Sequence, residues 1–203
     1  MKIGVLGTGN VATTLATGLL SAGHEIVFGS RDPKGKSGLL PAPVTTLEDA
    51  VAPDLVINAM PGGVALDVLK SIGPETLAGK ILVDVANALT AQWELLYPND
   101  SLGARIQDAL PGTRVVKTLN TISAPVMTAP KSLPTATSIF LSGNDKSAKH
   151  EVSRLLTDLG WAQDTQLDLG DITTARATEH YLFLSLALMT ATGTTTYNIS
   201  VVR

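Results

Sequence analysis

Hydrophobic and polar positions divide the chain into short apolar runs and longer stretches with helical periodicity. The apolar runs are typical of buried parallel strands, which we expect at residues 2–6, 25–29, 54–59, 81–85, 114–119, 138–142 and 161–164. Stretches with one apolar face predict helices at residues 10–22, 46–50, 64–72, 101–109 and 146–159. Because strands and helices alternate, the pattern predicts an α/β fold built on a doubly wound parallel sheet.

The first turn of this pattern is rich in glycine and lies between a strand and a helix. Gly7 permits a tight turn, and Gly9 has no Cβ to block a diphosphate that approaches the backbone. The free N–H groups from about Asn10 onward point toward such phosphates along the helix dipole. Ala12 replaces the third glycine of the usual G-x-G-x-x-G pattern, at a position that only needs close helix–strand packing.

This strand–turn–helix unit predicts dinucleotide binding. The alternative is an ordinary glycine turn in which Gly9 serves packing. We expect the contacts of the turn to come from Gly7, Thr8, Gly9, Asn10 and Val11.

The end of the second expected strand selects the dinucleotide. A chain that binds NAD usually has Asp or Glu there to bond the ribose 2′-OH, whereas this chain has Ser30 and Arg31. A hydroxyl and a guanidinium can bind a 2′-phosphate that a carboxylate would repel. We therefore predict NADP, with Ser30, Arg31 and Lys36 near that phosphate, although Lys36 also suits a solvated loop over residues 34–46.

Polar and small residues follow the middle strands, at the edge where ligands bind in open parallel sheets. Pro61 presets a turn after residues 54–59, and two glycines then let the chain pass close to a ligand. Asn87 either contacts a ligand or bonds its own backbone. Asp84 is expected to tie down its loop rather than act as a catalytic acid. Residues 120–123 form either a second wall of the site or a capped loop.

Residues 171–192 differ from the earlier helices because apolar residues lie nearly all round them. One sheet face cannot bury such a helix, so we expect one side on the ligand cleft and another against a second subunit. Asp171 is expected to cap it, with Arg176, Glu179 and His180 on its polar first turns. His180 is either a proton donor or, preferably, a structural histidine. Residues 197–203 suit a terminal strand.

Composition narrows the classes of function. The 203 residues, 44% hydrophobic, suit one α/β domain over residues 1–203 with residues 171–203 as its extension. A net charge of −3 argues against nucleic acid, and the absence of cysteine excludes disulfides and thiolate metal sites, so we expect no metal. Apolar runs too short to cross a bilayer and a strand starting at residue 2 predict a cytoplasmic protein without a signal peptide or membrane partner.

With these residues laid out, the chain resembles the NADPH:F-420 oxidoreductase family and the homologous reductase domain of the STEAP metalloreductases. The resemblance covers nearly the whole length. Ala88 stands where the family commonly has proline, and Leu119 replaces the usual aromatic residue. The matching motifs are GTGNVATTLATGLLSAGHEIVFGSR, INAMPGG, DVANAL, KTLNTISAPV, LSGNDKSAK and the closing YNISVVR.

The resemblance implies a single Rossmann-type domain with a short C-terminal helical extension, usually dimeric. NADPH would lie over the glycine turn, with Ser30 and Arg31 on the 2′-phosphate. By residue matching, the cofactor-binding residues that follow the middle strands are Ala59, Met60, Pro61, Asn87 and Ala88. The acceptor-binding residues would be Asn120, Thr121, Ile122 and Ser123.

The activity that follows is hydride transfer between NADP(H) and a small-molecule redox partner, either a deazaflavin (coenzyme F-420) or, second, a flavin such as FMN or FAD. Direct transfer needs two stacked rings rather than a strong acid or base, in keeping with a sequence in which no catalytic residue stands out. Two alternatives stay open. One is NADPH-dependent reduction of a small carbonyl or imine, with His180 or Ser123 as proton donor, and the other is a non-enzymatic NADP-binding sensor.

Overall fold

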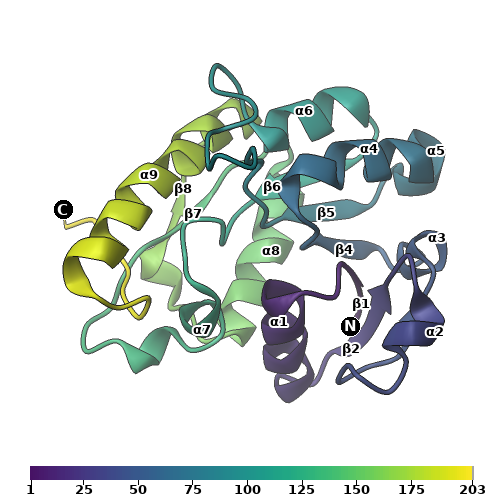
Figure 1. Cartoon of the computed structure of the whole chain (residues 1–203), viewed down its shortest axis with the longest axis horizontal. Helices are drawn as coiled ribbons and strands as arrows, with labels where there is room; N and C mark the ends of the chain where they lie inside the picture. Colours follow the sequence, from purple (N-terminus) through teal and green to yellow (C-terminus); the bar gives the residue numbers. More distant parts are fainter. Residues whose placement is uncertain (203) are drawn as a thin grey trace.

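A single twisted sheet forms the centre of the computed structural model, which describes residues 1–202 and leaves Arg203 outside the described residues (Figure 1). Its strands are all parallel and lie in the order β3-β2-β1-β4-β5-β6. The strands are β1 (Lys2–Leu6), β2 (Glu25–Gly29), β3 (Val44–Thr45), β4 (Leu55–Asn58), β5 (Ile81–Asp84) and β6 (Arg114–Lys117). This order confirms the predicted doubly wound, Rossmann-type α/β fold, with its reversal point between β1 and β4.

Helices cover both faces of this sheet, as Figure 1 shows. One apolar core joins the sheet to α1 (Asn10–Ser21), α7 (Ala124–Met127) and α8 (Lys146–Asp158). The other joins it to α3 (Leu47–Ala50), α4 (Gly62–Ile72), α5 (Pro74–Leu77), α6 (Leu102–Ala109) and the start of α9 (Ala175–Thr192). The helices predicted before residue 160 are confirmed to within about two residues, whereas α9 begins four residues later than expected and the short α5 and α7 were not predicted.

The register of the strands brings their carboxyl ends to one edge of the sheet. Leu6 of β1 lies beside Gly29 of β2 and Asn58 of β4, and Asp84 lies between Asn58 and Lys117. Residues that follow different strands, far apart in sequence, therefore meet at this edge.

The expected loop over residues 34–46 is partly wrong. Asp32 caps the short helix α2 (Pro33–Lys36) by accepting a 3.0 Å hydrogen bond from the Gly35 N–H, and Pro33 suits the first helical position. Val44 and Thr45 then add β3 to the edge of the sheet. A strand of two residues is too short to be predicted from the periodicity of hydrophobic positions.

The expected strand at residues 161–164 is also wrong. Trp161 is fully buried and its indole N–H donates to the Met127 carbonyl at 2.9 Å, so it acts as a core anchor. The chain then forms a short 3-10 turn, η2 (Gln163–Thr165), before β8 (Gln166–Asp168). β8 pairs with β7 (Ile139–Leu141) in a separate two-stranded parallel sheet. These strands therefore do not extend the main sheet.

Two expectations for the C-terminal part need correction. A 3-10 turn, η3 (Ile172–Thr174), precedes α9, and Asp171 caps that turn rather than the helix itself. Residues 197–202 form no strand, although the Ser138 N–H donates to the Ile199 carbonyl at 2.8 Å.

Burial of α9 on most sides is not seen within one chain. Its buried residues lie in the first turns, whereas Phe183 and Leu184 are 47% and 53% exposed. In the part of the chain that is described, no helix combines the length and the hydrophobicity that a membrane crossing requires.

Candidate functional site

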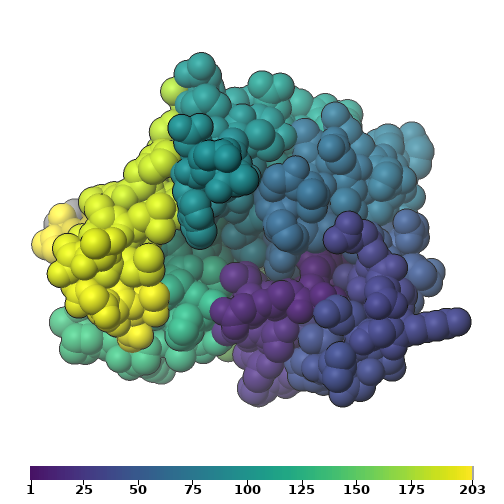
Figure 2. All heavy atoms as spheres, viewed as in Figure 1, coloured from purple at the N-terminus to yellow at the C-terminus, as the bar shows by residue number. Residues whose placement is uncertain are grey.

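A cavity of about 740 Å³ lies at the carboxyl edge of the main sheet. Figure 2 shows this face hollowed between the start of α1 and the C-terminal helix α9. Its volume is within the range of small-molecule sites, about 300–1,000 Å³. Walls come from the turn after β1, the ends of β2, β4, β5 and β6, and the chain from α9 onward. The cavity therefore occupies the position where open α/β sheets bind ligands.

The glycine turn forms one end of the cavity. Gly7 has φ +113°, and a Cβ there would lie 2.6 Å from the Ala59 carbonyl oxygen, so this glycine is required by the turn and by packing on β4. Gly9 differs, because a Cβ added to it would meet no atom within 4 Å. Packing therefore gives no reason for Gly9, and the open space beside it faces the cavity.

The N-terminus of α1 presents its backbone N–H groups at the same place. Gly9 is the N-cap, the first turn carries no acidic side chain, and no side chain in the described residues caps it. Unpaired N–H groups at the positive end of a helix dipole favour an anion. Ala12 is fully buried against the sheet, as its predicted packing role requires.

The segment after β2 adds positive charge to the wall. Ser30, Arg31 and Lys36 all line the cavity. Asp32 also lines it, but its carboxylate caps α2, and no ion pair of Arg31 or Lys36 occurs within residues 1–202. Both cations are therefore available to a bound anion.

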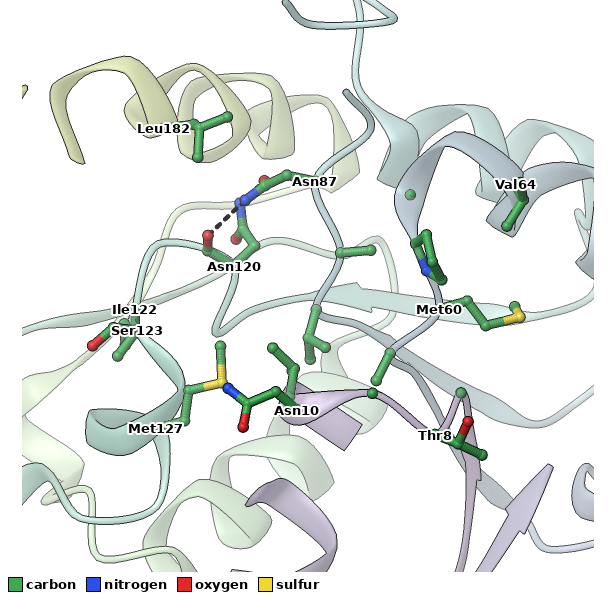
Figure 3. Close-up of a pocket in the computed structure, with 18 of the residues that line it drawn as sticks. Thr8, Asn10, Met60, Val64, Asn87, Asn120, Ile122, Ser123, Met127 and Leu182 are labelled. Carbon is green, nitrogen blue, oxygen red and sulfur yellow. Dashed lines mark hydrogen bonds between the residues drawn. The ribbon is translucent and has the colours of Figure 1, made fainter. Parts of the chain in front are cut away.

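Asn87 and Asn120 join the exits of β5 and β6. The Asn87 side-chain amide donates to the Asn120 carbonyl at 2.9 Å, and the Asn120 amide donates to Asn87 Oδ1 at 3.0 Å (Figure 3). Asn87 thus bonds the neighbouring loop rather than its own backbone, and both residues line the cavity. Leu119, just before Asn120, is in the left-handed region at φ +63°, which is costly for a β-carbon-bearing residue.

The structure brings the predicted site residues together on this one cavity, with one exception. Ala88 is 1% exposed and does not line it; the chain at Gly62 covers Ala88, with the Gly62 Cβ position only 2.7 Å from the Ala88 Cα. The predicted residues on its walls are Gly7, Thr8, Gly9, Asn10, Val11, Ser30, Arg31, Lys36, Ala59, Met60, Pro61, Asn87, Asn120, Thr121, Ile122 and Ser123.

The far end of the cavity lies against α7, α9 and the residues after α9. As expected, one side of α9 faces the cavity through Leu182, Ser185 and Met189. Met127 of α7, shown beside Asn10 in Figure 3, adds a thioether. Thr195 and Tyr197 complete this end. The sequence reasoning missed Met127, Thr195 and Tyr197; the closing YNISVVR motif was the available signal for Tyr197.

A buried ion triad lies at the strand ends that carry the loops of the cavity. Lys117 Nζ is 2.8 Å from Asp84 Oδ2 and 2.8 Å from Glu179 Oε1. Asp84 also accepts from the Asn58 amide at 2.8 Å and from the Ala86 N–H at 3.2 Å, while Lys117 donates to the Ala86 carbonyl. This network confirms that Asp84 ties down its loop.

Glu179 extends the triad to two helices. Its carboxylate accepts from the N–H groups of Leu102 and Gly103, at 2.9 and 3.2 Å, at the start of α6. Glu179 does lie in the first turns of α9, but the expectation that these turns are polar is wrong for Glu179, which is buried and only 1% exposed. The sequence analysis did not identify Lys117. Two signals for a buried pair were present: Lys117 is a lone cation at the end of an apolar strand, and Glu179 is a lone carboxylate on a largely apolar helix.

The triad changes the titration of its lysine. Burial by itself lowers the pKa of Lys117, but the neighbouring Asp84 and Glu179 carboxylates outweigh burial and hold this pKa above its ordinary value of 10.5. Lys117 is therefore a charged structural group and not a proton donor near neutral pH.

Other candidate groups lie apart from the cavity. His180 Nδ1 is 2.8 Å from the Arg176 carbonyl of its own helix, and His180 does not line the walls, which fits a structural histidine. Within residues 1–202, no cluster of three or more His, Cys, Asp or Glu side chains could hold a metal ion.

Known proteins resemble this chain in sequence and in fold. Residues 2–88 match the family model described as NADP oxidoreductase, coenzyme F420-dependent. A solved structure of a putative F420-dependent NADP-reductase from Arthrobacter sp. FB24 is 41% identical, covers all of both chains and has a TM-score of 0.93. An imine reductase from Streptomyces aurantiacus, 19% identical over 95% of this chain and 64% of its own with a TM-score of 0.69, shares the fold alone.

Curated relatives are longer proteins. The metalloreductase STEAP3 of Rattus norvegicus is 37% identical over 181 residues, which are 88% of this chain and 36% of the rat protein. Human metalloreductase STEAP2 is 30% identical over 89% of this chain and 35% of its own length. The chain thus spans about a third of the length of the curated relatives it matches.

The triad predicts a large loss of stability in Lys117→Met. Removing the cation leaves two buried carboxylates uncompensated, so we expect the free energy of unfolding in urea to fall by about 3–5 kcal/mol. The matched control is Arg154→Met, which breaks the exposed Arg154–Glu151 pair and should change it by less than about 1 kcal/mol. Equal, small effects of the two substitutions would refute a structural triad.

The same comparison has a pH dependence. Because folding raises the pKa of Lys117, its stabilising contribution is complete below the unfolded value of 10.5 and is lost as pH rises through the higher folded value. The stability difference between the wild type and Lys117→Met should therefore be present at neutral pH and should narrow as pH rises through the alkaline range.

Proposed function

The chain belongs to the family of coenzyme F420-dependent NADP oxidoreductases, and we propose that it transfers hydride between NADP(H) and a deazaflavin or flavin ring. Family membership supports the NADP-dependent oxidoreductase activity; the acceptor is our proposal. The proposal rests on one cavity that runs from the uncapped start of α1 to an uncharged far end.

NADP(H), when bound, supplies the hydride, and the residues at the near end fit its phosphates. The N–H groups at the start of α1 would hold the diphosphate beside Gly9, where the structure leaves open space. Ser30, Arg31 and Lys36 would hold the 2′-phosphate, since a guanidinium pairs with phosphate in two parallel hydrogen bonds. The nicotinamide half would then extend toward Met60, Pro61 and the joined Asn87 and Asn120 side chains.

The far end fits a flat, neutral ring. The charged residues that line the cavity, Arg31, Asp32 and Lys36, all follow β2, and among the described residues the far end has apolar side chains and hydroxyls. Direct hydride transfer needs two rings held at about 3–3.5 Å in the right orientation, which positioning residues supply. The exit of β6, Asn120 to Ser123, would form one wall beside the acceptor.

We also propose a homodimer through the exposed Phe183 and Leu184 on α9.

The turn provides a matched pair of variants. Gly9→Ala should leave the free energy of unfolding nearly unchanged, because its Cβ meets nothing in the protein, but should raise the Kd for NADPH about tenfold by occupying the diphosphate space, a change of ~1.4 kcal/mol. Gly7→Ala should instead destabilise the fold, because its Cβ meets the Ala59 carbonyl. Calorimetric titration and urea unfolding separate the two effects. Wild-type affinity in a folded Gly9→Ala protein would argue against a diphosphate at this turn.

Hydride transfer itself is tested by stopped-flow mixing. The protein with NADPH and oxidised coenzyme F-420, or FMN, should show loss of the acceptor's visible absorbance coupled to oxidation of NADPH. His180→Gln should leave this rate unchanged, whereas a carbonyl reductase that used His180 as proton donor would lose turnover. Absence of reduction of both acceptors by the wild type would reject the proposed acceptor class.

A further inference from the structure

Two hydroxyl groups meet at the far end of the cavity, and both come from the C-terminal segment. Ser185 Oγ of α9 lies 2.6 Å from Tyr197 Oη, and the Tyr197 hydroxyl also bonds the Ser185 carbonyl. Both residues line the cavity. A further hydrogen bond is made two residues before Tyr197, where Ser123 Oγ donates to the Thr195 carbonyl at 2.6 Å. The chain after α9 is thus bonded directly to the exit of β6.

The hydrogen bonds of this pair leave capacity for a ligand. A tyrosine hydroxyl has one proton, and here it goes to the Ser185 carbonyl, so the Ser185 hydroxyl donates to Tyr197 Oη. Ser185 Oγ keeps two lone pairs and Tyr197 Oη keeps one. A serine hydroxyl can also rotate toward a ligand carbonyl. The pair can therefore accept from an N–H group or donate to a carbonyl oxygen.

The surroundings of the pair favour a ring over a charged ligand. Leu182 and Met189 lie on the same side of α9 as Ser185, and Met127 of α7 lines the same cavity. Apolar walls with a few hydroxyls are typical of sites for neutral heterocycles, whose ring faces pack while one polar edge is hydrogen-bonded. The dioxopyrimidine edge of a flavin or deazaflavin, with alternating carbonyl and N–H groups, has the matching chemistry.

Polar contacts fix the segment that carries Tyr197. The Asn198 side-chain amide donates to Thr137 Oγ1 and to the Ser138 carbonyl, each at 2.9 Å. The Ser138 N–H donates to the Ile199 carbonyl at 2.8 Å, and the Val201 N–H donates to Ser138 Oγ at 2.9 Å. The segment that carries Tyr197 is therefore bonded both to α9, through Ser185, and to the chain at Thr137 and Ser138.

We propose that Ser185 and Tyr197 bind the carbonyl-bearing edge of the acceptor ring, so that the C-terminal segment completes the acceptor half of the site. The proposal rests on the proposed function. Hydride addition would break a C–H bond of the dihydronicotinamide, leaving NADP⁺, and would form a C–H bond on a deazaflavin or an N–H bond on a flavin. The negative charge that the ring gains would lie at its carbonyl edge until a proton from solvent completed the reduction. A Ser185 hydroxyl turned toward that edge would donate to the carbonyl that carries the developing negative charge, while the free lone pair of Tyr197 Oη would accept from the neighbouring ring N–H.

The test is steady-state kinetics of Tyr197→Phe with coenzyme F-420 and, separately, FMN as acceptor. Tyr197→Phe removes the group that accepts from the ring N–H and that holds the Ser185 side chain, so kcat/KM for the acceptor should fall about tenfold while the KM for NADPH is unchanged. Ser185→Ala should have a similar effect. The matched control is Tyr181→Phe, because the Tyr181 hydroxyl is buried without a partner among the described residues and Tyr181 does not line the cavity. This control should behave as the wild type.

Asn198→Ala separates binding from mere attachment of the segment, because Asn198 anchors it without lining the cavity. The inference fails if Tyr197→Phe matches the wild type, or if Asn198→Ala produces the same loss as Tyr197→Phe. A wild type that binds NADPH but reduces neither acceptor would reject the proposed function and this inference with it. An active wild type with an unaffected Tyr197→Phe variant would reject the inference alone.

Discussion

The Asp84–Lys117–Glu179 triad holds together the parts of the molecule that form the cavity. Its members are the only buried charged residues in the described part of the chain. Asp84 and Lys117 end adjacent strands, and Glu179 brings α9 onto those strands and onto the start of α6. Apart from its first turns α9 is largely exposed, so the triad sets the direction in which Leu182, Ser185 and Met189 reach the cavity. A buried ion network is costly to desolvate, and its value here lies in this specific arrangement of elements.

The two ends of the cavity are built in different ways. The near end comes almost entirely from one contiguous unit, β1 to the residues after β2, in which the turn, the helix start and the cations follow from local sequence. The far end joins residues more than 60 positions apart, such as Ser123 with Thr195. The two ends of the cavity therefore depend on different kinds of contact, local ones at the near end and long-range ones at the far end.

Local sequence signals therefore identified most residues that line the near end of the cavity, but they did not identify Met127, Thr195 or Tyr197 at the far end. Gly7, Gly9, Ser30 and Arg31 could be assigned because a strand, a turn and a helix follow one another in the chain, and the register of a parallel sheet then placed Met60, Asn87 and Asn120 at the same edge. Glu179 was misjudged because its partner Lys117 lies 62 positions away, and no periodicity reveals such a pairing. The short β3, the shift from a strand at 161–164 to β8 and the covering of Ala88 depend on tertiary packing, which overrides local preference.

We propose that the near end of the cavity holds NADP through its diphosphate and its 2′-phosphate. The most direct measurement is calorimetric titration of the wild type and of Arg31→Glu with NADP⁺ and NAD⁺. We expect the wild type to bind NADP⁺ more tightly than NAD⁺, and Arg31→Glu to lose about 2–3 kcal/mol for NADP⁺ because a charge-assisted pair is replaced by repulsion, with a much smaller loss for NAD⁺. Equal losses for the two nucleotides, or no binding of either by the folded wild type, would contradict the account.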